Sequence, residues 1–235
     1  MSQEPIAIVG SGCRFPGESS SPSKLWNLLR HPRDVSSKID RFAAASFYHK
    51  NGHYHGASNV LDAYLLAEDT RLFDAQLFNI QGGEAASMDP QQRLLIEVVY
   101  EALELAGLNT EELSGTDTGV YVGVMCNDFS QLTYSDLDNI PKYAATGTAL
   151  SILSNRLSYF FNWKGPSMTI DTACSSSLIA VHQAVQLLRS GQSRIAVAAG
   201  SNLIFSPSEW FPYTSGTKSM YRVFCTDFLS SQLYR

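Results

Sequence analysis

The sequence predicts an α/β fold, because residues 166–200 follow the order strand, helix, strand. Residues 166–171 are a short run with β-type residues behind Gly165, which favours a break from any earlier helix. Apolar residues then recur at spacings of three and four, as on one face of a helix, at Leu178, Val181, Val185 and Leu188. Residues 194–200 are small and β-branched without polar alternation, which indicates a buried strand. We therefore expect a βαβ unit whose helix ends at Gly191.

The N-terminal third of the chain contributes a strand and a short helix. Residues 5–17 are an apolar strand that leads into a glycine-rich loop, and residues 23–30 are a short amphipathic helix. The loop misses the Gly-x-Gly-x-x-Gly spacing and lacks the Lys-Ser/Thr pair of a P-loop, and Pro16 stands where a helix would begin. We therefore expect no nucleotide site there.

Three further elements precede the βαβ unit. A long apolar stripe predicts a helix from Pro90 to about residue 106, with Asp89 as its N-cap and Gly107 after its end. Residues 118–124 are nearly all apolar and indicate a central strand. Residues 146–163 are expected to form one helix, with an apolar face of Leu150, Leu153, Leu157 and Phe161.

Cys174 lies between the strand and the helix of the βαβ unit. In open α/β sheets the carboxyl ends of the strands border the ligand crevice. The unpaired N–H groups of a first helical turn favour a thiolate, and they can also bind the oxyanion that forms when a thioester carbonyl is attacked. A buried, inert cysteine at a tight junction is the alternative, and position alone leaves both open.

Composition and charge restrict the partners. The chain has 235 residues and a net charge of −5, and no basic stripe occurs, which argues against nucleic acid or an anionic membrane. No run of about 18 apolar residues and no signal peptide occur, so we expect a cytoplasmic protein. The four cysteines form no Cys-x-x-Cys pair, which fits a reducing compartment.

Three histidines lie close together in the sequence, and a metal site has to be considered. His49, His53 and His55 have no cysteine near them and follow no helical or strand period. Such a cluster is more typical of a loop surface, so we expect no metal.

Four separated motifs resemble one family. The octet Asp171-Thr-Ala-Cys174-Ser-Ser-Ser-Leu178 resembles the active-site signature of the β-ketoacyl synthase domains of polyketide synthases. Residues 10–17, 88–95 and 154–158 resemble further family motifs in the same order, most like those of fungal highly reducing, lovastatin-synthase-like synthases. The resemblance implies a thiolase-like, layered αβαβα fold. This chain would supply its first half, as the N-terminal part of the domain over residues 1–206.

The resemblance also implies a reaction. Cys174 would accept an acyl chain from the phosphopantetheine arm of an acyl carrier protein, with its backbone N–H toward the oxyanion. A malonyl unit on the carrier would then be decarboxylated and condensed with that acyl group. The resemblance implies no directly bound cofactor, because the phosphopantetheine arm belongs to the carrier protein. The segment after the strand at 118–124 would lie at a homodimer interface near the acyl pocket, which makes Met125 and Cys126 pocket candidates; the alternative is that Met125 fills a gap in the core.

Condensation in the family uses two histidines, from a His-Gly-Thr-Gly-Thr motif and an Asn-x-Gly-His motif, and neither motif occurs in this sequence. His182 lies eight residues along the helix from Cys174, about 12 Å away in helical rise. Residues 207–235 match none of the family landmarks expected there. We therefore expect a truncated chain that acylates Cys174 at most and exposes an apolar face.

Two other functions stay open. The first is a non-catalytic subunit or interaction fragment that pairs with an intact synthase; the presence of Cys174 favours catalytic descent instead. The second is a cysteine hydrolase, which needs a histidine base within reach that only the loop histidines could supply.

Overall fold

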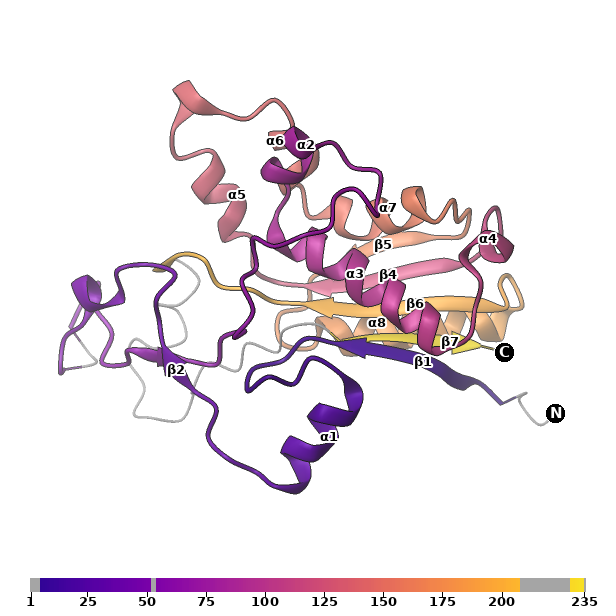
Figure 1. Ribbon diagram of the computed structural model, residues 1–235, viewed down its shortest axis with the longest axis horizontal. Coiled ribbons are helices and arrows are strands. Elements are labelled where there is room, and N and C mark those ends of the chain that lie inside the picture. The colour runs from indigo at the N-terminus through magenta and orange to yellow at the C-terminus, as the bar shows by residue number, and fades with distance from the viewer. Residues whose placement is uncertain (1–4, 52–53, 208–228, 235) are drawn as a thin grey trace.

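The computed structural model describes residues 5–51, 54–207 and 229–234, and these build a mixed sheet with helices on both faces (Figure 1). The strand order is β1-β7-β6-β4-β5. Its strands are β1 (Ala7–Cys13), β4 (Gly119–Val124), β5 (Ser167–Ile170), β6 (Ile195–Ser201) and β7 (Leu229–Tyr234). Strands β4, β5 and β6 are parallel, whereas β7 is antiparallel to both β1 and β6.

The βαβ unit is confirmed. Strand β5 leads into helix α8 (Ser176–Ser190), and β6 follows. Gly191 caps α8 in the left-handed conformation at φ 75°, which a residue with a Cβ adopts only at a cost.

The buried face of α8 differs from the predicted one. Leu178 is 69% exposed, and Val181 and Val185 are only partly buried. The buried residues are instead Ser176, Ala180, Ala184, Leu187 and Leu188. Small side chains let this face of the helix lie close to the sheet, whereas of the predicted stripe only Leu188 is fully buried.

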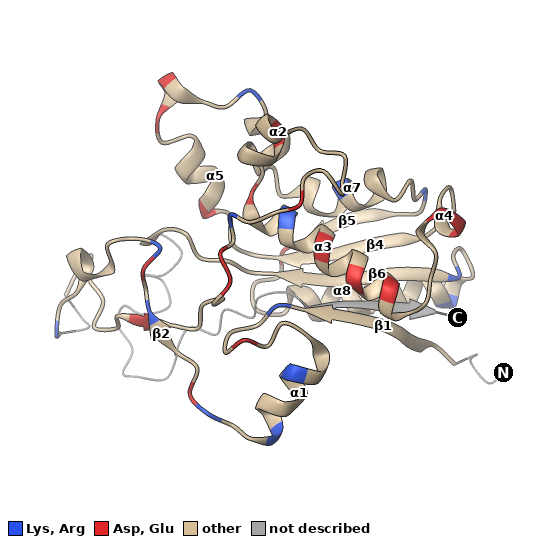
Figure 2. Cartoon of the chain, in the orientation of Figure 1, with Lys and Arg blue, Asp and Glu red and all other residues tan. Residues whose placement is uncertain are grey.

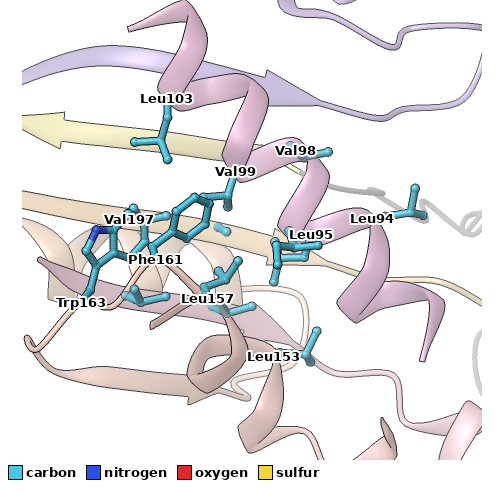
Figure 3. Packing of buried hydrophobic residues seen from close by; sticks show 14 of the residues in the cluster. Leu94, Leu95, Val98, Val99, Leu103, Leu153, Leu157, Phe161, Trp163 and Val197 are labelled. Carbon is cyan, nitrogen blue, oxygen red and sulfur yellow. The ribbon is translucent and has the colours of Figure 1, made fainter. Parts of the chain in front are cut away.

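Helix α3 (Pro90–Leu105) covers the opposite face of the sheet, as its apolar stripe predicts. Asp89 caps it by accepting a hydrogen bond from the Gln91 N–H at 2.8 Å. Burial, with the charge of Asp128 as a lesser cause, raises the pKa of the Asp89 carboxyl to about 6. The α3 side chains pack with α7 (Ser151–Phe160) and strand β6, as Figure 3 shows for Val99, Leu157, Val197 and others.

The single helix expected over 146–163 is wrong. Helix α6 (Ala144–Thr148) ends before α7 begins, and Ala149 between them is extended. The Gly147 carbonyl accepts from the Asp89 N–H at 2.7 Å and from Gln92 Nε2 at 3.0 Å. Because these donors belong to the start of α3, they replace the bonds that a continuing helix would make. The far end stops at Phe160, and Asn162 there has φ 57°.

Shorter elements surround this core. The predicted helix near residue 23 is confirmed as α1 (Pro22–Arg30). A small ladder joins β2 (Ser37–Lys38) to β3 (Asp62–Ala63). The others are η1 (Ala44–Phe47), α2 (Gly82–Ser87), α4 (Thr110–Leu113), α5 (Asp128–Thr133) and η2 (Leu137–Asn139).

Charged side chains avoid the large sheet. Figure 2 shows charged residues on helices, on loops and on the small β2–β3 ladder, with acidic residues along α3 and no blue band across the fold. Within residues 5–51, 54–207 and 229–234, no helix has the length and apolar character that crossing a membrane requires.

Candidate active site

Cys174 lies where the sequence predicts it, on the short elbow between β5 and α8. Because β4, β5 and β6 are parallel, their carboxyl ends meet at one edge of the sheet, and the elbow leaves that edge. The Cys174 thiol is exposed, which removes the alternative of a buried, inert cysteine. Cys13 and Cys126 are buried, and burial raises the pKa of the Cys13 thiol. Cys225, which carried no functional expectation, lies outside the described residues.

The elbow turns sharply at Ala173. This residue has φ 56°, a left-handed conformation that costs roughly 1–2 kcal/mol for a residue with a Cβ. The Ala173 N–H donates to Asp171 Oδ1 at 2.9 Å. The Ser175 hydroxyl donates to the Thr172 carbonyl at 2.8 Å. These local bonds hold the turn that presents Cys174.

The buried Ser176 hydroxyl stabilises the elbow with two hydrogen bonds. It accepts from the Thr172 N–H at 2.8 Å and donates to the Ala173 carbonyl at 2.6 Å. The side chain is only 4% exposed, so water cannot easily replace either bond. The sequence pattern places Ser176 in the first helical turn but predicts no role for it, because nothing in a run of three serines distinguishes the middle one.

Two paired glycines bring the start of α8 onto the sheet. Gly123 of β4 and Gly200 of β6 lie opposite each other in the register. A Cβ on Gly123 would lie closer than 3.0 Å to backbone atoms of Ser176 and Ser177, and one on Gly200 would lie 2.7 Å from Ser177 Cβ. The glycines therefore position the helix terminus, and with it Cys174, against the strand ends.

The start of α8 is also open to a ligand. Among the residues placed in the structure, the N–H of Cys174 donates no hydrogen bond, and the thiol lies at the terminus of a 15-residue helix. A helix N-terminus carries roughly half a positive charge. Cys174 lies two residues before Ser176, the first residue of α8, so its N–H is a donor available to a developing oxyanion beside this positive end.

The remaining candidates lie elsewhere. His182 is exposed on α8, and its eight-residue separation corresponds to about 12 Å of helical rise. His49 stacks on Tyr54 with ring centroids 4.3 Å apart, while His53 lies outside the described residues. No group of three potential metal ligands occurs in the described part of the chain. Met125 is half-buried directly after β4, at the edge that Cys174 occupies.

The fold and the elbow together define a class, the thiolase-like α/β proteins, of which this chain has the first half. A family model described as the N-terminal domain of β-ketoacyl synthases matches residues 3–220. The chain belongs to the β-ketoacyl synthase family.

Relatives agree with this assignment. The chain is 73% identical over 207 residues to the hybrid PKS-NRPS synthetase buaA of Petromyces alliaceus. It is 62% identical over 206 residues to the lovastatin nonaketide synthase, polyketide synthase component, of Aspergillus terreus strain NIH 2624. These alignments cover 88% and 87% of this chain, which spans 5% and 7% of the two relatives' lengths.

A solved structure agrees as well. The ketosynthase domain OzmH KS7 of oxazolomycin biosynthesis, from Streptomyces albus JA3453, matches with a TM-score of 0.85 at 31% identity. The match covers 99% of this chain and 43% of that domain. The chain is therefore part of a ketosynthase domain of the polyketide synthase type.

Proposed function

We propose that Cys174 is the nucleophile of an acyl transfer. Its thiolate attacks the carbonyl carbon of an acyl thioester, and a tetrahedral oxyanion forms. The donor's carbon–sulfur bond then breaks, the donor leaves as a thiol after taking a proton, and the acyl group stays on Cys174. The observation that supports this is that the Cys174 thiol is exposed on a turn that hydrogen bonds of Ser176 stabilise, directly before α8.

The backbone N–H of Cys174 is the proposed oxyanion donor. It has no acceptor within the described part of the chain, and its direction is fixed by the bonds of Ser176 and Asp171. A donor that is already oriented needs no rearrangement when charge develops on the carbonyl oxygen. The positive end of the α8 dipole lies beside Cys174 and would stabilise the negative charge that develops in this first step.

The acyl donor would be the phosphopantetheine thioester of an acyl carrier protein, and the second substrate a malonyl unit on that carrier. Decarboxylative Claisen condensation belongs to the complete synthase. The family's two histidine motifs do not occur in this sequence, so we expect this chain to acylate Cys174 but not to catalyse condensation unaided.

The proposal also includes homodimerisation and a role for Met125 in lining the acyl pocket. The division of the chain at residue 206 stays a prediction.

Mass spectrometry of the intact 235-residue chain tests the acyl transfer. After exposure to acetyl-N-acetylcysteamine, we expect one acetyl adduct, which peptide mapping assigns to Cys174 and which Cys174→Ala abolishes. A folded chain without this adduct would contradict the proposal.

A non-catalytic subunit that pairs with an intact synthase is the second candidate. That function predicts stable association with an intact synthase and no adduct. Association that survives Cys174→Ala, together with an unmodified wild-type thiol, would support it over acyl transfer.

A further inference from the structure

Gln91, in the first turn of α3, has a fully buried side chain whose polar atoms are all hydrogen-bonded. Its Nε2 donates to Asp89 Oδ2 and to the Cys126 carbonyl, each at 3.2 Å. Its Oε1 accepts from the Ser201 hydroxyl at 2.7 Å and from the Leu203 N–H at 3.2 Å. One amide therefore satisfies four buried partners.

These partners belong to the segments that leave the two central strands. Cys126 lies two residues after the end of β4, Ser201 ends β6, and Leu203 follows it. The two segments also touch each other, because Cys126 Sγ donates to Asn202 Oδ1. Gln91 thus joins the exits of β4 and β6 to the start of α3.

Both exits lie at the edge of the sheet that carries Cys174. Gly123 and Gly200, just before these exits, contact the first turn of α8 from the other face. The segments after parallel strands form the walls of the crevice at such an edge. A shift in either exit would therefore move a wall of the site relative to the Cys174 thiol.

We propose that Gln91 is a positioning residue that sets the wall formed by residues 125–126 and 201–203, and thereby the acyl chain length that Cys174 accepts. This inference rests on the proposed acyl transfer. Gln91 does not touch the thiol, so it should affect which acyl group fits rather than how reactive Cys174 is.

The amide is suited to this role because it both donates and accepts. Methionine has a similar volume but makes neither bond, so the Cys126 carbonyl and the Leu203 N–H would each lose the hydrogen bond that they share with Gln91. The loops would then have to move to find water. A displacement of this kind changes the fit of a substrate even where the overall fold persists.

The neighbouring Gln92 provides a matched control. It is also buried, at 3% exposure, but its bonds run away from the strand exits. Its Nε2 donates to the carbonyls of Thr146 and Gly147, and its Oε1 accepts from Arg156 Nε. Gln92→Met therefore removes a comparable buried amide without touching the crevice wall.

The experiment compares Gln91→Met with Gln92→Met in the full 235-residue chain, with folding checked by circular dichroism and size exclusion. Cys174 acylation rates are measured with acetyl- and octanoyl-N-acetylcysteamine, and iodoacetamide alkylation is mapped at each cysteine. In Gln91→Met we expect the octanoyl-to-acetyl rate ratio to shift about tenfold. The rate of iodoacetamide alkylation at Cys174 should stay within about twofold of the wild-type rate. The rate at the buried Cys126 should rise about tenfold.

Gln92→Met should leave the ratio and the protection of Cys126 unchanged. A folded Gln91→Met with the wild-type ratio overturns the inference, and so does an equal shift in Gln92→Met. If Gln91→Met does not fold, Ser201→Ala, which removes one of the four hydrogen bonds, is measured instead. A shift of about twofold in its octanoyl-to-acetyl rate ratio supports the inference, and an unchanged ratio overturns it.

The two proposals fail in different ways. If wild-type Cys174 takes no acyl group, the proposed function falls. Loss of Cys126 protection in Gln91→Met alone still supports the positioning role in that case. Unchanged Cys126 protection overturns it.

Discussion

Ser176 shows how much one buried hydroxyl can determine. It bonds to both residues that precede Cys174, and one of them, Ala173, is held in a conformation that alanine does not favour. Without the hydroxyl, the Thr172 N–H loses this acceptor and the Ala173 carbonyl keeps only the Ser176 N–H as a donor, so the elbow can relax toward an unstrained turn.

We expect Ser176→Ala to lower the free energy of unfolding by about 1–3 kcal/mol, because the Thr172 N–H loses its buried acceptor and the Ala173 carbonyl loses one of its two donors. The acylation rate of Cys174 should fall as well, because its thiol and N–H are no longer held. Denaturant titration and adduct kinetics measure the two effects. Ser177→Ala is the control, since no hydrogen bond of the Ser177 hydroxyl occurs in the described residues; equal losses in both variants would contradict this role for Ser176.

Asp89 should make stability depend on pH in a defined direction. Its pKa is raised to about 6 in the folded protein, by burial first and by the Asp128 charge second, from an ordinary value near 3.8. Between these two values the folded state binds more protons than the unfolded state, so this contribution to stability falls as pH rises toward 6. Ionisation above pH 6 costs about 3 kcal/mol at one buried carboxyl.

On moving from pH 7 to pH 5 this group should therefore add about 1 kcal/mol to the free energy of unfolding. Asp89→Asn, which keeps an oxygen for the helix cap, should lack that gain. Urea titrations at the two pH values measure it. The exposed Asp74, which accepts from the Leu77 N–H, provides the control as Asp74→Asn. An unchanged pH response in Asp89→Asn would contradict the assignment.

At the scale of elements, the contact between α8 and the sheet is the decisive one. The helix approaches β4 and β6 over paired glycines and presents small residues of its own, Ser176, Ala180 and Ala184. Such a contact has no spare volume, because interiors are packed about as densely as organic crystals.

Gly123→Ala should therefore push the start of α8 away from β4. A Cβ there meets backbone atoms of Ser176 and Ser177 that no rotamer change can move. We expect a loss of about 1–3 kcal/mol in the free energy of unfolding and slower acylation of Cys174. Denaturant titration and adduct kinetics test both.

The control is Gly83→Ala in α2, where nothing lies within 4 Å of the added Cβ. It should keep the wild-type acylation rate and leave stability unchanged or raised by up to about 1 kcal/mol. A Gly123→Ala variant that behaves like Gly83→Ala would show that the close approach is not needed.

The elements that sequence reasoning predicts correctly carry local signals. Asp89 and Pro90 mark the start of α3, and Gly191 marks the end of α8. The break between α6 and α7 has no such signal, because the Gln92 side chain that donates to the Thr146 and Gly147 carbonyls lies in α3, more than 50 positions earlier in the sequence. In the site, the strand-to-helix order is enough to locate Cys174, whereas Ser176 differs from its neighbours only once the elbow is folded.

For the whole molecule, the sequence is enough to predict the family, but it does not predict that β7 completes the sheet. The resemblance to ketosynthases rests on separated motifs, and the family match over residues 3–220 confirms it. Strand β7, by contrast, lies in the segment 207–235, for which no element was expected. β7 lies between β1 and β6 because its backbone pairs with strands that are distant in the sequence, and no local sequence pattern predicts such pairing.

The position of β7 has a consequence for biosynthesis. The register places Ala7 opposite Tyr234, 227 positions later, and on its other edge β7 pairs with β6. Within the large sheet β1 pairs with β7 alone, so it cannot join that sheet until residues 229–234 have left the ribosome. Until then the backbone N–H and C=O groups along β1 lack their strand partner, and a nascent chain with such an edge is open to capture by chaperones or by strands of other chains.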